Sequence, residues 1–361
     1  MTDEIFMREA IRIARNAIGR TSPNPLVGSV IVKDGKIIAE GWHRQAGTPH
    51  AEVHALNMAG ELAEGATLYV NLEPCSHFGR TPPCAKKIIE CGIKKVVAAM
   101  SDPNPKVAGR GFELLRSAGI EVEVGICEED AKKLNEVFIK WVTTGFPFVT
   151  MKFASSLDGK IATSTGESQW ISCFESRKYV HHLRGINDAV LIGVGTVLAD
   201  NPSLTTRLVE GKNPVRVIVD STARTPIDSN VVTDKSARTI IAVSENAPAE
   251  KISALENLGV EIILAGNERV DLKILMRELA RREITSVLVE GGGQIHFSML
   301  SARLVDKVYA FIAPKIIGGA NALTAVEGVG FNKLSDAVTL KNFTAEKIGE
   351  DILLSGYVTG A

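Results

Sequence analysis

The sequence is poor in cysteine, in aromatic residues and in excess charge, and each shortage excludes a class of protein. Its 361 residues include five cysteines, a sparse and odd number that does not suit the disulfide framework of a secreted protein. Aromatic residues make up 5% of the chain and the formal net charge is −1, so the chain lacks the basic, stacking-rich surface of a nucleic-acid-binding protein. No apolar run approaches the roughly 18 residues that a membrane helix requires. The N-terminus begins with acidic residues rather than a secretory signal, and we expect a cytoplasmic protein that binds neither nucleic acid nor membrane.

What the sequence does contain is a cluster of metal-binding residue types in its first quarter. Glu52 follows His50 by two residues, and Cys75 and Cys84 each come directly after a proline. One imidazole and two thiolates can hold Zn²⁺ and leave its fourth position open for water, whose pKa then falls to about 7. A carboxylate that does not ligate the metal can move a proton from this water to a leaving amine. We therefore predict that His50, Cys75 and Cys84 bind zinc and that Glu52 moves the proton.

The alternative is a structural zinc site, which normally has four protein ligands. His77 or Cys91 is close enough in sequence to supply the fourth. The order of the segments favours a catalytic site, because a helix is predicted to begin after Pro83, and a thiolate at a helix N-terminus is stabilised by unpaired amides. Eight residues separate Cys75 from Cys84, whereas the general deaminase pattern has two. This longer loop carries polar and cationic groups that could contact a substrate.

Strand and helix patterns alternate along the whole chain, which predicts largely parallel sheets with both faces covered by helices. In the first half the pattern predicts strands at 27–32, 67–72 and 95–100, a hairpin turn at Asp34-Gly35, and helices at 5–18, 51–59, 109–118 and 128–140. In the second half it predicts strands at 149–154, 189–193, 215–219, 239–243, 261–264, 286–289, 307–312, 338–347 and 351–357, and helices at 175–184, 250–258, 271–282 and 292–301. Gly145 and Pro147 interrupt the pattern between the halves. We therefore predict two α/β domains, residues 1–145 and 146–361.

Two glycine-rich stretches in the second half follow predicted strands. They are Gly193-Val194-Gly195 and Gly291-Gly292-Gly293. Glycines let backbone amides approach phosphate oxygens, and a helix N-terminus favours negative charge. Neither stretch completes G-x-G-x-x-G, so an ordinary strand-to-helix turn is the alternative for each. Trp170 could stack on a cofactor ring or, as a lone aromatic residue, lie in the core.

Together these segments resemble the bifunctional deaminase/reductases of bacterial riboflavin biosynthesis. The resemblance covers nearly the whole chain and rests on long ungapped segments, namely residues 21–28, 41–43, 50–52 and 72–84 in the first half and 152–160, 193–202 and 290–293 in the second. The eight-residue cysteine spacing is that of this family. The resemblance implies an N-terminal cytidine-deaminase-like, three-layer α/β/α domain followed by a dihydrofolate-reductase-like α/β domain that uses NADPH.

The resemblance also implies roles for single residues by matching position. Zinc would be held by His50, Cys75 and Cys84, with Glu52 as the proton shuttle. NADPH would be contacted by Ala154, Trp170, Thr196, Asp200, Ser221, Gly292 and Gly293. The substrate would be contacted by Asn24, His77, Ser168, Arg184, Leu204, Arg207 and Glu290.

The implied reactions act on small phosphorylated pyrimidines. The first is hydrolytic deamination of 2,5-diamino-6-ribosylamino-4(3H)-pyrimidinone 5′-phosphate, and the second is reduction of the ribosyl side chain of the product to ribityl by NADPH. No residue marks itself as the acid or base of the second step, for which Lys152, Asp200 and Glu290 are candidates that could equally form salt bridges. We expect the protein to act as a homo-oligomer.

Two other functions fit parts of the sequence. A nucleic-acid deaminase shares the zinc core, but it needs a basic and aromatic binding face that a net charge of −1 and 5% aromatic residues do not supply. A zinc-stabilised nucleotide-binding regulator would need the metal ligands and no proton shuttle. Substitution of Glu52 separates this regulator from an enzyme.

Overall fold

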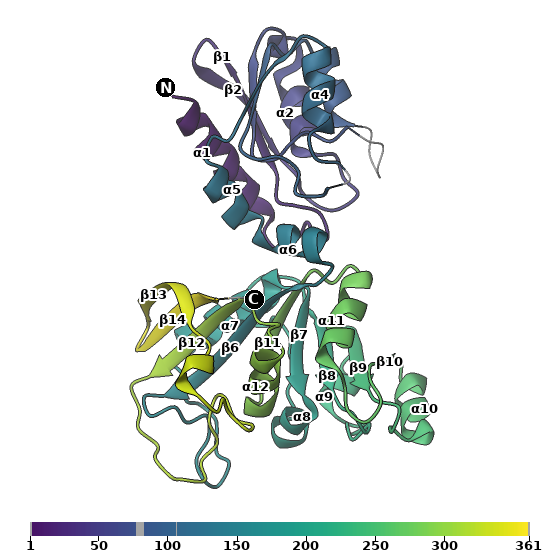
Figure 1. Ribbon diagram of the computed structural model, residues 1–361, viewed down its shortest axis with the longest axis vertical. Helices are drawn as coiled ribbons and strands as arrows, with labels where there is room; N and C mark the ends of the chain where they lie inside the picture. The colour runs from purple at the N-terminus through teal and green to yellow at the C-terminus, as the bar shows by residue number, and fades with distance from the viewer. Residues whose placement is uncertain (1, 77–82, 106, 360–361) are drawn as a thin grey trace. The chain divides into compact units, whose positions relative to one another are not determined.

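The computed structural model describes residues 2–76, 83–105 and 107–359, and the chain divides into two compact units, Met1–Gly145 and Phe146–Ala361. Each unit has its own sheet and its own helices (Figure 1). Within the described segments, no helix combines the length and the apolar character needed to cross a membrane.

The sheet of the first unit has five strands in the order β2-β1-β3-β4-β5. Its strands are β1 (Gly28–Lys33), β2 (Lys36–Trp42), β3 (Thr67–Val70), β4 (Lys95–Ala98) and β5 (Glu121–Val124). β3, β4 and β5 run parallel, whereas β1 is antiparallel to both of its neighbours. The antiparallel pair follows from the two-residue turn at Asp34 and Gly35, where φ is 51° and 72°, as a tight hairpin requires.

Helices cover both faces of this sheet. They are α1 (Asp3–Ala14), η1 (Arg15–Ala17), α2 (Ala51–Ala59), η2 (Gly60–Ala63), α3 (Cys84–Glu90), α4 (Arg110–Ser117), α5 (Glu128–Leu134) and α6 (Glu136–Thr144). Buried residues of α2, α3 and α4 form one core with the sheet, and those of α1 and α5 form a second core. The arrangement confirms the predicted three-layer α/β/α fold. The helix predicted at 128–140 is two helices, because Asn135 between them departs from helical geometry (φ −105°, ψ 21°).

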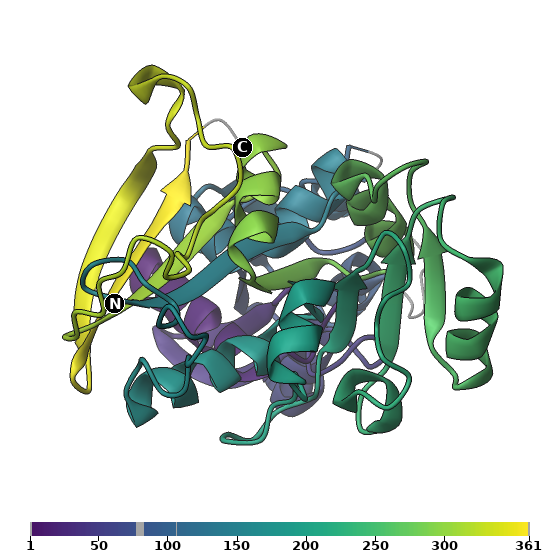
Figure 2. The same cartoon turned by 90° about the horizontal axis from the view of Figure 1, so that it is seen from below.

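The sheet of the second unit has nine strands in the order β10-β9-β8-β7-β11-β6-β12-β14-β13. Its strands are β6 (Phe148–Ser156), β7 (Ala189–Gly193), β8 (Val215–Val219), β9 (Thr239–Val243), β10 (Glu261–Leu264), β11 (Ser286–Gly291), β12 (Lys307–Ala313), β13 (Leu340–Ile348) and β14 (Asp351–Val358). The strands from β10 to β12 are parallel, and β14 and β13 add an antiparallel edge. In Figure 2 these two yellow strands lie at one edge of the sheet and the green strands β9 and β10 at the other.

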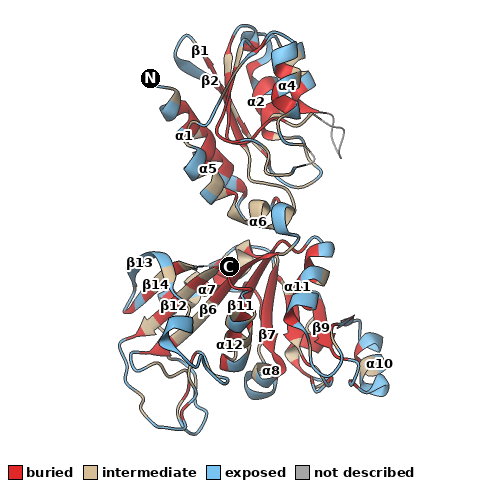
Figure 3. Ribbon diagram, in the orientation of Figure 1, coloured by how far each residue is buried: buried red, intermediate tan, exposed pale blue. Residues whose placement is uncertain are grey.

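Helices cover this sheet as well. They are α7 (Phe174–Ile186), α8 (Val194–Asp200), α9 (Asn230–Thr233), α10 (Ala249–Asn257), α11 (Leu272–Arg281), α12 (Gly293–Ser301) and η3 (Leu334–Asp336). α11 and α12 pack into one core, and α8, α9 and α10 into another. Figure 3 shows the central strands buried and the outward helix faces exposed. The sequence pattern missed α8, α9 and β5.

The order of the strands creates a switch point in this sheet. β7 and β11 are neighbours, but the chain leaves β7 towards β8 on one side and leaves β11 towards β12 on the other. α8 and α12 begin directly after these two strands. Open parallel sheets bind ligands in the crevice at the carboxyl ends of such strands.

Candidate active sites

The structure brings His50, Cys75 and Cys84 together in the first unit. His50 is the N-cap residue of α2, Cys84 is the first residue of α3, and Cys75 lies in the segment that follows β3. Nδ1 of His50 lies 3.2 Å from Sγ of Cys84 and 3.5 Å from Sγ of Cys75. A nitrogen and two sulfurs converge on one point, which suits the tetrahedral N/S coordination of zinc.

A fourth protein ligand is absent from this cluster among the residues that the structure describes. Cys91, one of the two sequence candidates, packs against the apolar core under α2 and α3. His77, the other candidate and also a predicted substrate contact, lies outside the described residues. The three-ligand set fits a zinc ion whose fourth position takes water or substrate, as in catalytic sites.

The electrostatics of the cluster favour a thiolate. The backbone N–H of Cys84, at the start of α3, donates to Sγ of Cys75 at 3.2 Å. Hydrogen bonding from the Cys84 thiol and, next to it, from His50 lowers the pKa of Cys75 to about 4, against the effect of burial. The same thiolate raises the pKa of His50 and of Cys84. A cysteine binds zinc in its deprotonated, thiolate form.

Glu52 lies in the first turn of α2 and is 3% exposed. Its Oε2 atom is buried and has no hydrogen-bond partner within the described part of the chain. Burial raises the pKa of Glu52 to about 7, against the opposing effect of His50. A carboxyl group poised near neutral pH can both accept and donate a proton, as a general acid/base must. A buried and unpaired carboxyl atom is costly for stability, which indicates a role in chemistry.

Asn24 is half-buried in the segment before β1 and interacts with His43. The two atoms Nδ2 of Asn24 and Nε2 of His43 are 3.0 Å apart, and Nδ1 of His43 lies 3.2 Å from the Pro49 carbonyl oxygen. Burial lowers the pKa of His43, so the neutral ring accepts from Asn24 and donates to Pro49. The His43 ring meets the His50 ring edge-on at 5.3 Å between centroids. His43 connects Asn24 to the metal cluster, a role that the sequence pattern did not reveal.

Two buried asparagines hold the backbone that carries Asn24. Asn71 accepts from the Gly28 N–H and donates to the Leu26 carbonyl, at 2.8 and 2.9 Å. Asn135 accepts from the Leu26 N–H at 2.8 Å and donates to the same carbonyl at 3.0 Å. The break between α5 and α6 at Asn135 therefore serves to fix this segment.

Glu73 anchors the segment that carries Cys75. Its buried carboxylate accepts three backbone N–H groups, from Asp102 at 3.1 Å, Gly109 at 2.9 Å and Gly111 at 2.9 Å. These bonds tie the loop between β4 and α4 to the residue before Pro74. The sequence pattern indicates no role for Glu73 beyond its place in the segment 72–84.

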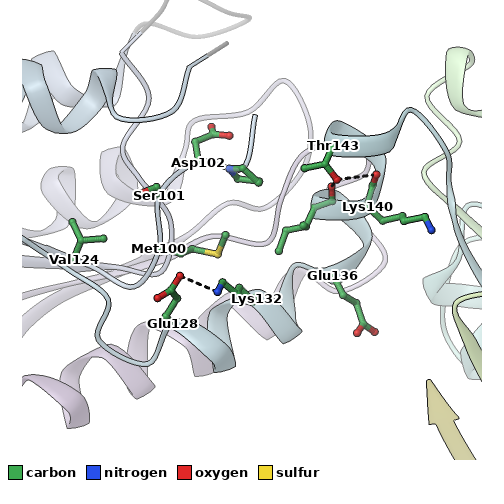
Figure 4. Close-up of a pocket in the computed structure, with 11 residues that line it drawn as sticks. Met100, Ser101, Asp102, Val124, Glu128, Lys132, Glu136, Lys140 and Thr143 are labelled. Atoms are coloured by element: carbon green, nitrogen blue, oxygen red, sulfur yellow. Dashed lines mark hydrogen bonds and ion pairs between the residues drawn. The ribbon is translucent and has the colours of Figure 1, made fainter. Parts of the chain in front are cut away.

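A cavity of about 580 Å³ lies at the carboxyl ends of β4 and β5, bordered by α5 and α6 (Figure 4). Met100 and Val124 contribute apolar side chains to it, and Glu128 and Lys132 form an ion pair of 2.9 Å beside it. None of the residues predicted to bind zinc, cofactor or substrate lines this cavity.

In the second unit the two glycine-rich stretches meet at the switch point. Gly292 is the N-cap residue of α12, and Thr196 Oγ1 on α8 lies 3.7 Å from the place that a Cβ atom on Gly292 would take. A Cβ atom on Gly293 would lie 2.6 Å from Cγ of Glu327 and 2.8 Å from the Thr324 carbonyl oxygen. Only glycine fits there, and the free amides at the start of α12 suit the pyrophosphate of a dinucleotide.

The other predicted cofactor contacts are more dispersed. Ala154 is half-buried on β6, Asp200 is the exposed last residue of α8, and Ser221 follows β8. The Ser221 hydroxyl accepts from the Val270 N–H at 3.0 Å, which fixes a neighbouring loop. Trp170 is 57% exposed, so its interpretation as a core residue is wrong. The Arg177 guanidinium lies 4.5 Å from the centroid of the exposed Trp170 ring.

Arg184 of α7 and Glu290 of β11 form a buried, bidentate ion pair. Their Nε–Oε1 and Nη2–Oε2 distances are 2.5 and 2.7 Å, and their side chains are 12% and 7% exposed. Burial alone would raise the pKa of Glu290, but Arg184 holds it at about 2. Burial lowers the pKa of the nearby Lys152, while Glu290 opposes this effect. Glu290 is one of the three candidates for the acid or base of the reductase step. It forms a salt bridge, which was the alternative to that role.

The backbone segment from 203 to 207 is fixed beside this ion pair. Leu204 is 3% exposed and has a φ of 52°, which turns the chain sharply. The Thr205 carbonyl accepts from Nη1 of Arg184 at 3.2 Å, and the Arg207 N–H donates to Nδ1 of His181 at 3.0 Å. The predicted substrate residues Arg184, Leu204, Arg207 and Glu290 therefore lie close together in space. Ser168 lies half-buried in the segment between β6 and α7.

Two family models match separate parts of the chain. Residues 1–100 match the family model of the zinc-binding region of cytidine and deoxycytidylate deaminases, and residues 147–354 match the model of the RibD C-terminal domain. The riboflavin biosynthesis protein RibD of Actinobacillus pleuropneumoniae is 48% identical over 358 residues, which cover 98% of this chain and 95% of that protein.

Two solved structures are similar over nearly their whole length. RibD of Acinetobacter baumannii has a TM-score of 0.90 and 40% identity, with 99% of both chains covered. The diaminohydroxyphosphoribosylaminopyrimidine deaminase/5-amino-6-(5-phosphoribosylamino)uracil reductase of Thermotoga maritima has a TM-score of 0.86 and 43% identity, with 98% of both chains covered. The chain therefore belongs to the RibD family, the bifunctional deaminase/reductases of riboflavin biosynthesis, with a zinc-binding deaminase domain and an NADPH-using reductase domain.

Proposed function

We propose that residues 1–145 deaminate 2,5-diamino-6-ribosylamino-4(3H)-pyrimidinone 5′-phosphate and that residues 146–361 then reduce 5-amino-6-(5-phosphoribosylamino)uracil. The proposal is supported by the separation of the two groups of residues, since each lies within one unit of the fold. It is also supported by the chemistry of each group, which suits hydrolysis in one case and binding of an anionic dinucleotide and a sugar phosphate in the other.

In the deamination, His50, Cys75 and Cys84 would hold zinc. When bound, zinc would lower the pKa of a water molecule enough to supply hydroxide at neutral pH. The role of Glu52 is to accept a proton from water and to deliver it to the exocyclic amine, as a C–O bond forms at C2 of the ring, the C–N bond breaks and ammonia leaves. Asn24, held by His43, and His77 orient the pyrimidine.

In the reduction, bound NADPH would supply the hydride for C1′ of the ribose, and the chain's own residues bind and orient cofactor and substrate. Arg184, Arg207 and Glu290, with Ser168 and the backbone turn at Leu204, hold the sugar phosphate. The cofactor is held by Ala154, Trp170, Thr196, Asp200, Ser221, Gly292 and Gly293. Lys152, half-buried on β6 near Glu290, is the candidate for moving the accompanying proton.

The observation that carries the proposal is the unpartnered, buried carboxyl atom of Glu52 beside a three-ligand metal cluster. The test is Glu52→Gln, which keeps the shape of the side chain and removes its ability to shuttle a proton. We expect ammonia release to fall by about 10²–10⁴-fold, the usual contribution of a general acid/base. Zinc content and NADPH oxidation with the deaminated sugar phosphate should stay unchanged. Ammonia release at the unsubstituted rate would show that Glu52 is not the shuttle.

We propose further that the protein is a homo-oligomer in the cytoplasm. The five cysteines, all without disulfide partners, support a reducing compartment. Sedimentation analysis of the purified chain tests the oligomeric state, and a single species at the monomer mass of 38.7 kDa would contradict it.

A further inference from the structure

The segment from 203 to 207 is held in place before any substrate binds, by side chains of β8, of α7 and of the segment before β8. Nε of Arg216 on β8 donates to the Ser203 carbonyl at 2.9 Å. Nη1 of Arg184 on α7 donates to the Thr205 carbonyl at 3.2 Å. The third anchor is the bond from the Arg207 N–H to Nδ1 of His181, at 3.0 Å. Carbonyl oxygens receive the first two bonds, whereas His181 is the acceptor in the third. A fourth bond runs from the Thr206 N–H to Oδ1 of Asn213, at 2.8 Å.

His181 lies one turn before Arg184 on the same side of α7 and is 4% exposed. Its ring can accept the Arg207 N–H only while Nδ1 carries no proton. The charged groups that face the ring are Arg184 on α7, Arg207 on the segment and Glu290 on β11. Burial, followed by Arg184 and Arg207, lowers the pKa of His181 to about 4, so the ring stays neutral in the physiological range.

This bond fixes the backbone of Arg207, and the bond to Asn213 fixes the preceding residue, Thr206. Arg207 is exposed, whereas Leu204, Thr205 and Thr206 before it are buried. Without an acceptor at His181, the Arg207 N–H would lose its hydrogen-bond partner, and the exposed guanidinium would adopt more orientations. A flexible cation binds phosphate more weakly than an ordered one, because ordering it costs entropy on binding.

We propose that His181 is a positioning residue of the sugar-phosphate site, whose neutral imidazole fixes the backbone of Arg207 so that its guanidinium is aligned with the 5′-phosphate before the substrate arrives. This inference rests on the proposed function of Arg207 as a substrate contact. It assigns no contact between His181 and the substrate itself.

The test compares three variants of the full chain in the reductase assay. His181→Leu removes the acceptor, and we expect the KM for the phosphorylated substrate to rise by about tenfold, in line with an unpaired buried donor. The kcat, the affinity for NADPH and the rate of ammonia release should stay the same. His181→Asn restores an acceptor oxygen close to the place of Nδ1, so its KM should return to within about twofold of the unsubstituted chain. His182→Leu, at the exposed neighbouring position, is the matched control.

A substrate that lacks the 5′-phosphate separates positioning from a general loss of structure. Its KM should be the same for His181→Leu and the unsubstituted chain, since no phosphate is there to be aligned. An equal rise in KM for both substrates, or no rise for either, would overturn the inference. If His181→Leu does not accumulate as folded protein, His181→Phe takes its place, because it keeps a planar ring without an acceptor.

Arg207→Ala distinguishes failure of the inference from failure of the proposed function. If Arg207→Ala leaves the KM for the phosphorylated substrate unchanged, the proposed substrate contact is wrong and the inference fails with it. If Arg207→Ala raises this KM while His181→Leu does not, the contact stands and the positioning role of His181 is refuted.

Discussion

The buried ion pair between Arg184 and Glu290 gives the sharpest energetic prediction. Glu290→Gln keeps the size of the side chain and one acceptor oxygen, but it removes the negative charge. Arg184, whose side chain is 12% exposed, would then be left as a buried cation without a counter-ion. Breaking a buried pair in this way costs roughly 3–5 kcal/mol, because the remaining charge is not solvated.

The lowered pKa of Glu290 gives the free-energy cost of breaking this ion pair by a second route. Lowering it from its ordinary value of 4.5 to about 2 corresponds to about 3 kcal/mol, at about 1.4 kcal/mol per pH unit. Because the side chain is only 7% exposed, solvent screening reduces this value little. Both estimates predict that Glu290→Gln lowers the free energy of unfolding of the second unit by about 3 kcal/mol at pH 7.

The pH dependence has a definite sign. The pKa of Glu290 is lower in the folded state than in the unfolded state, so the stabilisation is fully present above about pH 4.5 and is lost as the pH falls through about 2. The difference in stability between the unsubstituted chain and Glu290→Gln should therefore be constant above about pH 5 and shrink at lower pH.

Calorimetry of the full chain measures this difference, and added NADPH identifies the transition of the reductase unit because ligand binding shifts it upwards. The matched control is Glu261→Gln, which breaks the exposed pair with Arg238, whose side chains are 44% and 61% exposed. Glu261→Gln should lower the free energy of unfolding by no more than about 1 kcal/mol. The reasoning would be refuted if Glu290→Gln and Glu261→Gln had the same small effect, or if the cost of Glu290→Gln grew as the pH was lowered.

The remaining predictions concern the metal and the cofactor. Cys75→Ser should abolish zinc binding, measured by mass spectrometry, and ammonia release. Cys91→Ser should keep both, because Cys91 packs against the apolar core. Loss of zinc in Cys91→Ser would show a four-ligand, structural site. Gly293→Ala should weaken NADPH binding by about tenfold in a fluorescence titration, because its Cβ atom would lie 2.8 Å from the Thr324 carbonyl and displace the start of α12. Unchanged NADPH affinity of Gly293→Ala would place the cofactor elsewhere.

The comparison of prediction and structure shows where local patterns suffice. The helix predicted at 51–59 and the strands predicted at 189–193, 215–219, 239–243 and 261–264 have the bounds that the structure gives them. These segments have apolar residues at helical spacing or in a short run, so the signal lies within a few neighbouring residues. The helix predicted at 128–140 failed at Asn135, because its side chain bonds with the distant Leu26, which no local pattern contains.

The sequence by itself determined the two α/β domains, the family and the candidate zinc ligands with Glu52. Residue type and close spacing carry this information, since a metal site needs particular donor atoms and the motif segments hold most of them. The tertiary structure alone decided the neighbours of each site. In the folded chain β7 and β11 are adjacent, Arg184 pairs with Glu290, Trp170 is exposed, and His181 accepts a hydrogen bond from the Arg207 N–H. These contacts join residues about 20 to 100 positions apart, and the physical reason for them is the order of strands in the sheet, which follows from packing of the whole domain.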